Sequence, residues 1–319
     1  MNKILITGAS GYLGSHITRR LVKKNDVYGL CRQIPENFSL LQLSKEKLII
    51  GDLSDLKLYN IISKKNFDVI IHLVSLDHHE SEKSAVNSME INVIPTLKLL
   101  NCFYQRGLKK FIYFSTMQVL GHLESSIITT EFVPSPINKY GLTHLLSEQI
   151  VNYYNTITNI ECINIRLSNG YGSPIFSENN CWWLVINDIC KSAYEKNEIN
   201  LLSDGSPLRD FIHVSDIAKA IELLVDNKNN ASRNTYNLCS GRTVSILFIA
   251  HCVKTIYENK FNKEIKIVLP SGLVSDHYKP FDKIKNLVFD NSSLQKIGFK
   301  PKMSLEQGIE EMFDYLIEG

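Results

Sequence analysis

Short apolar runs alternate with longer amphipathic stretches through the first half of the chain. The runs predict strands at Lys3–Thr7, Asp26–Leu30, Leu48–Gly51, Val69–Val74, Phe111–Ser115 and Glu161–Leu167. The stretches between them predict helices such as Ser15–Lys24, Ser88–Arg106 and Tyr140–Thr156. Nearly continuous apolar strands separated by helices are typical of a parallel sheet that is covered on both faces. Because such crossovers are right-handed, the pattern predicts an α/β fold with a doubly wound parallel sheet.

The pattern becomes less regular after about Asn169, where prolines mark loops. We therefore predict a main domain over residues 1–168 and a smaller lobe over residues 169–319, with parts of 205–240 returning to the main domain. Open α/β sheets bind their ligands at the carboxyl ends of the strands. The smaller lobe is expected to cover that edge and to bind the substrate.

Composition narrows the class of protein further. The chain has 319 residues, of which 44% are hydrophobic, so it can bury a large core. A formal net charge of +2 without a long basic run predicts no nucleic-acid partner. No apolar stretch approaches the roughly 20 residues that span a membrane. Seven cysteines, an odd number without C-x-x-C spacing, indicate reduced thiols in a cytoplasmic protein.

The first strand runs directly into three glycines at the spacing G-x-x-G-x-x-G, and a helical stretch follows. Gly8 would make the tight turn, Gly11 would let the backbone approach a pyrophosphate, and Gly14 would let the helix pack closely on the strand. The helix N-terminus would direct its unpaired N–H groups and its positive dipole end at the phosphates. A flexible glycine-rich turn is the alternative. The position between a strand and a helix favours a dinucleotide site.

Two hydroxyl groups are the candidates for chemistry. Thr116 ends a predicted strand at the ligand edge of the sheet, and Tyr140 begins a predicted helix. A hydroxyl and a phenol that converge on one point can polarise a carbonyl and give it a proton. A strand-end threonine and a packing tyrosine are the structural alternative for each residue alone.

These motifs resemble the extended short-chain dehydrogenase/reductases, in the branch of nucleotide-sugar epimerases, dehydratases and reductases. The resemblance implies that Thr116 orients the substrate and that Tyr140 is the acid/base at a sugar hydroxyl or ketone. It runs nearly end to end, through the blocks Thr7–Gly14, Gly51–Asp55, Asp68–Ser75, Phe114–Gly121, Tyr140–Glu148, Arg166–Pro174, Arg209–Asp216 and Tyr236–Leu238.

The resemblance also implies a Rossmann domain with a full set of site residues. The catalytic group is Thr116, Tyr140 and His144. The cofactor-binding residues are Gly8, Ser10, Gly11, Tyr12, Leu13, Gly14, Arg32, Asp52, Leu53, Leu73, Ser75, Tyr140 and His144, with Asp52 and Leu53 near the adenine. The substrate-binding residues are Thr116, Asn169, Arg209 and Lys279, with Asn169 and Arg209 near the substrate diphosphate.

One departure lies in the catalytic motif itself. The family pattern is Tyr-x-x-x-Lys, whereas this chain has His144 four residues after Tyr140. The family lysine holds the nicotinamide ribose and lowers the tyrosine pKa by its charge. A histidine, with an ordinary pKa of about 6.5, still donates to a ribose hydroxyl but supplies less charge at neutral pH. Tyr140 then stays protonated, which favours reduction of a ketone slightly. An oxidation that retains the reduced cofactor is equally compatible, and an impaired enzyme is the remaining alternative.

Two further departures concern specificity. Dehydratases of this branch have an Asp-Glu pair after the threonine, whereas Met117 and Gln118 follow here, so a 4,6-dehydratase is not expected. NAD enzymes usually have an acid at the end of the second strand, where this chain has Cys31 followed by Arg32. Arg32 suits a 2′-phosphate, so NADP is favoured over NAD, although Arg32 can instead stack on adenine or face solvent.

Several motifs remain outside this assignment. Lys279 replaces the arginine of the family's Arg-Pro-Gly-Asp turn and lacks its bidentate fork. Adjacent His78 and His79 are expected in a loop near the ligand mouth, where on an extended chain they would point to opposite faces, so no metal site is predicted. Trp182 and Trp183 are expected in a helix of the smaller lobe. In this family the two long helices of the first half form a homodimer interface.

The sequence therefore predicts an NAD(P)-dependent oxidoreductase that acts at C4 of a nucleotide-activated sugar, as a 4-dehydrogenase or 4-ketoreductase. Its family context implies bacterial surface-polysaccharide biosynthesis. A nucleotide-sugar 4-epimerase is the alternative, and a non-catalytic cofactor-binding regulator is a third hypothesis.

Overall fold

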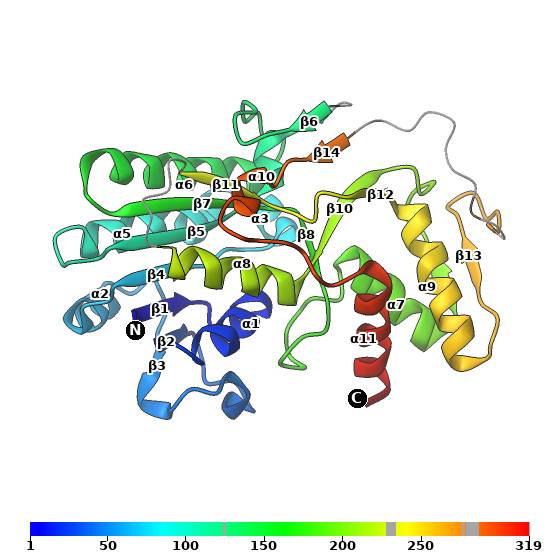
Figure 1. Cartoon of the computed structure of the whole chain (residues 1–319), viewed down its shortest axis with the longest axis horizontal. Helices are drawn as coiled ribbons and strands as arrows, with labels where there is room; N and C mark the ends of the chain where they lie inside the picture. Colours follow the sequence, from blue (N-terminus) through cyan, green and yellow to red (C-terminus); the bar gives the residue numbers. More distant parts are fainter. Residues whose placement is uncertain (124–125, 228–233, 276–277, 279–286, 319) are drawn as a thin grey trace.

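A computed structural model describes residues 1–123, 126–227, 234–275, 278 and 287–318. Its centre is a seven-stranded sheet in the order β11-β7-β5-β4-β1-β2-β3, and every neighbouring pair is parallel (Figure 1). The doubly wound parallel sheet predicted from the sequence is confirmed. The strands are β1 (Lys3–Thr7), β2 (Asp26–Cys31), β3 (Leu48–Ile50), β4 (Val69–His72), β5 (Lys110–Thr116), β7 (Glu161–Leu167) and β11 (Thr235–Leu238).

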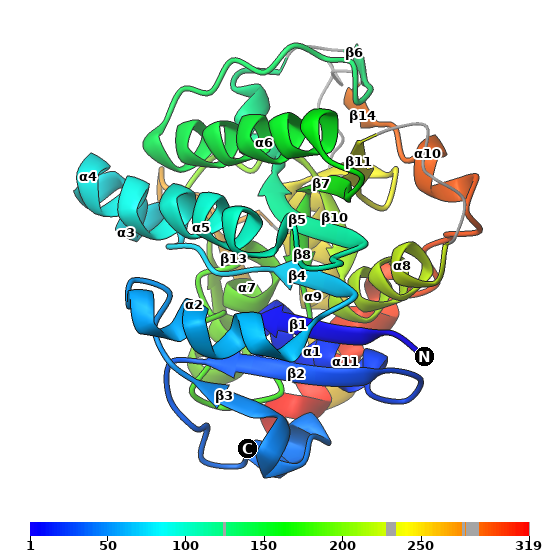
Figure 2. The same ribbon diagram turned by 90° about the vertical axis from the view of Figure 1, so that its left-hand side faces the viewer.

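Helices cover both faces of this sheet (Figure 2). Alternate residues of each strand point to opposite faces, so apolar side chains on both faces need a covering layer. Ile4 and Ile6 pack in a core cluster with α1 (Tyr12–Leu21) and α8 (Val214–Asp226). Leu5, between them, packs in a second cluster on the other face. That second layer consists of α2 (Leu56–Ile62), α5 (Ile94–Phe103) and α6 (Lys139–Ile157).

The helical region predicted as Ser88–Arg106 is divided. It consists of α4 (Ala85–Ser88), a π-helical turn at Met89–Val93, and α5. Pro95 lies in the first turn of α5, where its missing N–H breaks the regular hydrogen-bond ladder. The pattern of apolar positions continues through this change, so periodicity alone does not reveal it.

The second lobe forms around a third core cluster and lies beyond the carboxyl ends of the main strands (Figure 1). Its three-stranded sheet is β8 (Asn169–Tyr171), β10 (Leu208–His213) and β12 (Thr243–Ser245). Two short pairs are β9 (Glu198–Asn200) with β13 (Lys266–Val268), and β6 (Ser126–Ile128) with β14 (Leu287–Phe289). The remaining helices are α3 (His78–Lys83), α7 (Val185–Lys196), α9 (Ile246–Phe261), α10 (Ser292–Gln295) and α11 (Leu305–Glu318).

The chain returns to the main sheet after entering the second lobe. Helix α8 packs on α1, and β11 pairs with β7 at the sheet edge, whereas β10 stays in the three-stranded sheet.

Two local predictions of secondary structure are wrong. His78 and His79 begin helix α3, because Asp77 caps its N-terminus by accepting from the N–H of Glu80. Trp182 and Trp183 lie in the turn before α7. No helix among the described residues is long and apolar enough to cross a membrane.

Candidate active site

The glycine turn has the geometry that a bound pyrophosphate requires. Gly8 has a φ of +73°, which favours glycine, and a Cβ on Gly14 would lie 2.0 Å from the carbonyl oxygen of Gly8. Helix α1 begins directly after Gly11, and no side chain caps it. Its first N–H groups therefore remain available to an anion. These residues fit the phosphates of a dinucleotide, with the turn and the start of α1 as the holding elements.

The residues beside the turn connect it to the second lobe. The Ser10 carbonyl accepts from Asn179 Nδ2 at 2.9 Å, and the Tyr12 hydroxyl donates to the Gly172 carbonyl at 2.8 Å. Tyr12, Leu13 and Ser75 line the large cavity described below. At the end of β4, the N–H of Leu73 donates to Thr7 Oγ1 at 3.2 Å. The Tyr12 phenol is thus committed to a backbone contact rather than to a ligand.

The residues predicted to bind the adenine follow β2 and β3, the last two strands at one edge of the main sheet. Asp52 Oδ1 accepts from the N–H of Ser54 at 2.8 Å, and this bond is the main cause of the lowered pKa of Asp52. The positive charge of Arg32 lowers the pKa of Asp52 further, so the two side chains lie within electrostatic reach. Leu53 is buried beside them, whereas Arg32 is exposed.

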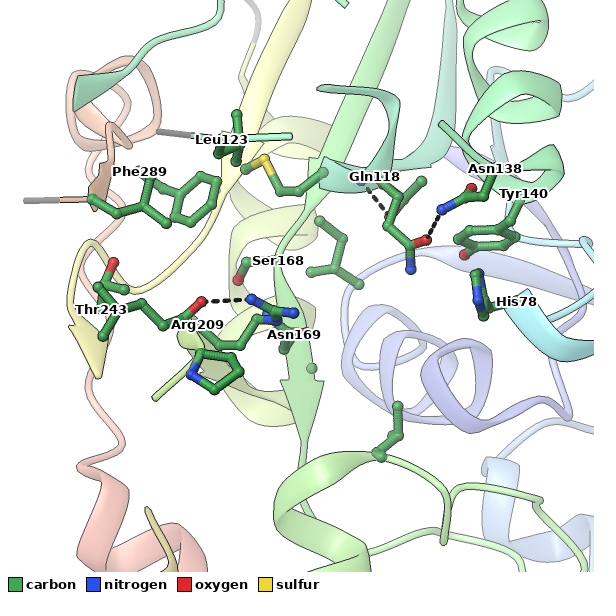
Figure 3. A pocket seen from close by; sticks show the side chains of 18 of the residues that line it. His78, Gln118, Leu123, Asn138, Tyr140, Ser168, Asn169, Arg209, Thr243 and Phe289 are labelled. Atoms are coloured by element: carbon green, nitrogen blue, oxygen red, sulfur yellow. Dashed lines mark hydrogen bonds between the residues drawn. The ribbon is translucent and has the colours of Figure 1, made fainter. Parts of the chain in front are cut away.

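One cavity of about 1420 Å³ brings the predicted catalytic and substrate residues together (Figure 3). Tyr140 lines one part of it, and Asn169 and Arg209 line another. Thr116 also lines the cavity and forms a hydrogen bond with Tyr140. The cavity exceeds the roughly 300–1,000 Å³ of ordinary small-molecule pockets. It therefore has room for an extended ligand with two chemically different ends.

Local packing brings Tyr140 toward the strand end. Asn138 caps α6 by accepting from the N–H of Gly141 at 2.7 Å. A Cβ at Gly141 would lie 2.5 Å from the carbonyl oxygen of Gln118, so only glycine permits this approach. Gln118 follows Thr116 in a single 3₁₀ turn, Met117–Leu120. The first turn of α6 and the end of β5 are consequently held in contact.

The phenol of Tyr140 is protonated in this environment. Burial, and to a lesser extent the negative charge of Asp77, raise the pKa of Tyr140 to about 12, although a hydrogen bond with Thr116 opposes the change. The His78 ring stands edge-on to the Tyr140 ring, with centroids 6.1 Å apart. At neutral pH, Tyr140 therefore has a proton to give, and removing that proton is the harder direction.

The structure places His144 behind Tyr140 rather than on the cavity wall. The two rings stand edge-on with centroids 4.5 Å apart, and His144 is 2% exposed. Its Nδ1 atom lies 2.8 Å from the hydroxyl of Tyr113, on β5. Direct contact of His144 with a cofactor ribose stays a prediction.

The opposite end of the cavity is built on a buried carboxylate. Asp210 accepts from the Ser168 hydroxyl and from the N–H groups of Ser240 and Gly241, at 2.8–2.9 Å. Burial raises the pKa of Asp210, and these hydrogen bonds oppose the change. The Asp210 carbonyl also accepts from Asn169 Nδ2 at 2.9 Å, which fixes that amide in the cavity.

Arg209 keeps its guanidinium available to a ligand. Among the described residues, the only hydrogen bond of its side chain runs from Nη1 to the Leu208 carbonyl, at 2.8 Å. The described residues contain no ion pair between Arg209 and Asp210 or Asp204, and Asp204 instead accepts from Ser206. The predicted substrate residue Lys279 lies outside the described residues.

Other cavity residues were not identified from the sequence. They come from separate loops and strands, and no shared spacing connects them in the chain. Gln118 Oε1 accepts from Asn138 Nδ2 at 2.9 Å beside Tyr140, a pairing across 20 residues. Among the described residues, no group of three or more His, Cys, Asp and Glu side chains is arranged to hold a metal ion. The additional lining residues shown in Figure 3 include Leu123, Ser168, Thr243 and Phe289. His78 also lines the cavity, as expected for a residue near the ligand mouth.

Comparison with known proteins now decides the family. The model of the NAD dependent epimerase/dehydratase family matches residues 4–239. The chain belongs to this family. The resemblance inferred from the sequence is confirmed, and the protein is an enzyme of an NAD-dependent family.

Relatives cover the chain almost completely. It is 25% identical to a putative UDP-glucose 4-epimerase of Methanocaldococcus jannaschii, over 98% of each chain. It is 26% identical to the dTDP-L-rhamnose 4-epimerase of Burkholderia thailandensis, over 99% of this chain and 95% of the relative. The same fold occurs in the UDP-glucuronic acid 4-epimerase of Bacillus cereus, solved with UDP-glucuronic acid and NAD. That structure has a TM-score of 0.82 and 24% identity and covers 99% of both chains.

Proposed function

We propose that this family member is a nucleotide-sugar 4-epimerase that works with NAD. The observation that carries the proposal is the single cavity that joins Thr116 and Tyr140 at one end to Asn169 and Arg209 at the other. A guanidinium and an amide suit a diphosphate, and two hydroxyl groups suit the reacting sugar carbon. The sequence predicts a net 4-dehydrogenase or 4-ketoreductase, with a 4-epimerase as the alternative. The 4-epimerases among the relatives support that alternative.

The chain's own residues supply the proton chemistry. The phenolate of Tyr140, which is the minor form at neutral pH because burial raises the pKa of this phenol to about 12, takes the proton from the C4 hydroxyl. The resulting phenol later returns the proton to the same oxygen, and Thr116 orients that oxygen. NAD bound at the glycine turn supplies a reversible hydride acceptor. Asn169 and Arg209 hold the diphosphate while the oxidised sugar turns over and presents its other face. Met117 and Gln118 have no carboxylate, so the chain lacks at these positions the acid pair that would eliminate water.

Reduction of a 4-keto sugar is the second candidate, and it rests on one specific observation. His144 is buried, and burial lowers its pKa to about 3, so it brings no positive charge to Tyr140 at neutral pH. A protonated Tyr140 gives a proton to a ketone readily. A net ketoreductase would oxidise added NADPH or NADH stoichiometrically with a 4-keto sugar, whereas an epimerase would not.

The direct test is conversion of sugar nucleotides by the purified protein. We expect UDP-glucose, UDP-N-acetylglucosamine or a dTDP-6-deoxyhexose to be converted to its C4 epimer without net change in nicotinamide absorbance. Anion-exchange chromatography and proton NMR of the products would measure this. Conversion that consumes reduced cofactor would contradict the epimerase assignment and support the reductase.

The cofactor preference is tested at Asp52. We propose NAD as the cofactor, because structural relatives were solved with NAD and because Asp52 faces the charge of Arg32. Replacing Asp52 with Asn should leave NAD binding nearly unchanged and tighten NADP binding about tenfold, since a repelling charge is removed. Calorimetric titration of both dinucleotides measures the ratio. Asp55→Asn is the matched control, because Asp55 caps α2 through the N–H of Lys57. Stronger binding of NADP than of NAD by the unmodified protein would contradict the assignment.

Arg209 is tested as the diphosphate ligand. Arg209→Met should raise KM for the sugar nucleotide about 10- to 100-fold, because charge-assisted hydrogen bonds are worth about 1.5–3 kcal/mol. Arg209→Lys should recover part of the loss, since it restores charge without the bidentate fork. Both variants should keep kcat within a few-fold of the unmodified enzyme, because Arg209 lies away from Tyr140 in the cavity (Figure 3). An unchanged KM would place the diphosphate elsewhere.

We also propose a homodimer that uses α5 and α6. Both helices leave large apolar side chains exposed, although each covers the sheet with its other face. The exposed residues are Ile94 and Leu97 on α5, and Leu142, Tyr153 and Ile157 on α6.

The seven cysteines are all unbridged thiols, as suits a cytoplasmic enzyme. We assign its product to bacterial surface-polysaccharide biosynthesis, in which nucleotide-activated sugars are the donors.

A further inference from the structure

The residue behind the catalytic phenol has a partner that the sequence motif does not include. His144 stands where the family pattern has a lysine, and its ring is packed edge-on against Tyr140. Its ring also contacts Tyr113, a residue of β5 that is 1% exposed. The Tyr113 hydroxyl is 2.8 Å from His144 Nδ1, and the two rings are tilted at 37° with centroids 5.8 Å apart.

The direction of this hydrogen bond depends on which ring nitrogen of His144 carries the proton. Burial lowers the pKa of His144 to about 3 and raises the pKa of Tyr113 well above its ordinary value, so both groups are neutral at pH 7. If the neutral phenol donates its proton to Nδ1, the imidazole carries its own proton on Nε2. Nε2 is buried and has no hydrogen-bond partner in the described part of the chain. The Phe114 carbonyl nevertheless lies near enough to raise the pKa of His144 slightly, as an acceptor facing a ring N–H does.

We propose that Tyr113 is a positioning residue, whose hydroxyl holds the neutral His144 ring in the Nε2–H form against Tyr140 and so fixes the orientation of the catalytic phenol. This inference deepens the proposed function and rests on it where Tyr140 is the acid/base. In this chain, His144, which occupies the position of the family lysine, acts on Tyr140 by packing and orientation rather than by charge. Tyr113 is not among the residues that line the cavity.

The first experiment is nitrogen NMR of the full-length protein labelled in histidine, without added cofactor or sugar. We expect the His144 signals, identified by their loss in His144→Phe, to show an unprotonated Nδ1 and a protonated Nε2. The ring should remain neutral from pH 8 to about pH 5, because the pKa is lowered by burial. A proton on Nδ1, or two interconverting tautomers, would overturn the proposal. These spectra decide it even if the sugar chemistry is not epimerisation.

The second experiment uses Tyr113→Phe, which removes only the hydroxyl. We expect the His144 tautomer to change or become mixed, the Tyr140 ring resonances to shift, and kcat to fall about tenfold with KM unchanged, as misorientation of a catalytic group predicts. In a His144→Phe background, the same change should alter kcat less than about twofold, because the hydroxyl acts through His144.

Tyr154→Phe is the matched control. Tyr154 belongs to the same core cluster as Tyr113 and lies on α6, ten residues beyond His144, about 15 Å away at the rise of a helix. It should change neither the tautomer nor kcat. Equal losses of kcat for Tyr113→Phe in both backgrounds would assign Tyr113 a general structural role and overturn the proposal. If Tyr113→Phe does not fold, the spectrum of the unmodified protein remains decisive.

Discussion

Tyr140→Phe should lower kcat for the sugar nucleotide about 10²- to 10⁴-fold, which is the usual contribution of a positioned acid/base. The change removes one oxygen atom from the cavity wall and keeps the ring that packs on His144 and His78. Binding of the sugar nucleotide should therefore change little, since the diphosphate is held at the other end of the cavity. A loss in kcat with an unchanged KM identifies an interaction made in the transition state.

The measurement is initial rate at saturating substrate, accompanied by calorimetric binding of the sugar nucleotide. Tyr153→Phe is the control, because Tyr153 lies on the same helix and is 58% exposed. The rate of the unmodified enzyme should also rise with pH in the direction that oxidises the sugar, since burial raises the pKa of Tyr140 to about 12. Full activity in Tyr140→Phe would remove the catalytic role and favour a non-catalytic cofactor-binding regulator.

The main sheet and the glycine turn were predictable because their determinants are local. The strands that form the centre of the sheet are short apolar runs, and the observed bounds differ from the predicted ones by at most two residues. The turn needs glycine at position 8 because φ is positive there, and at position 14 because a Cβ would clash with the Gly8 carbonyl. The strand–glycine–helix order of the sequence is enough to predict both requirements. The places of Thr116 at a strand end and of Tyr140 at a helix start are as expected, and their catalytic roles stay predictions.

The surroundings of these residues were not predictable, because they depend on contacts between distant segments. His144 and Tyr113 are 31 residues apart and meet only when α6 packs on β5. The Asp210 carboxylate is satisfied by Ser168 and by the turn at Ser240, which arrive from β7 and β11. A capping aspartate before His78 begins a helix where a loop was expected. In the first two cases, hydrogen-bond partners from elsewhere in the fold decide the arrangement, whereas the cap of α3 is a local contact over three residues.

The second large effect is expected on stability, at a buried ion pair beside strand β5. Arg166 on β7 and Glu148 on α6 are joined by two hydrogen bonds of 3.0 and 2.8 Å, and their side chains are only 6% and 1% exposed. Ser115, next to Thr116, donates its hydroxyl to the same carboxylate at 2.6 Å. Glu148→Gln or Arg166→Met should therefore lower the free energy of unfolding by about 3–5 kcal/mol, because one buried group loses its partner.

Denaturant unfolding measures this loss, and two comparisons isolate its cause. Lys83→Met breaks the exposed pair with Glu80, whose side chains are 68% and 49% exposed, and should change the unfolding free energy by less than about 1 kcal/mol. Combining Glu148→Met with Arg166→Met should cost less than the sum of the two single changes, since no buried charge then remains. Additive losses would show that the two residues act independently.

The same pair connects stability to catalysis through Ser115. When Glu148 loses its charge, the hydroxyl of Ser115 keeps only a weaker acceptor, and the strand end that carries Thr116 is held less firmly. The double methionine variant restores packing but not this hydrogen bond, so it should recover stability more than it recovers kcat. A variant that regained both together would show that the ion pair contributes to the site only through overall stability.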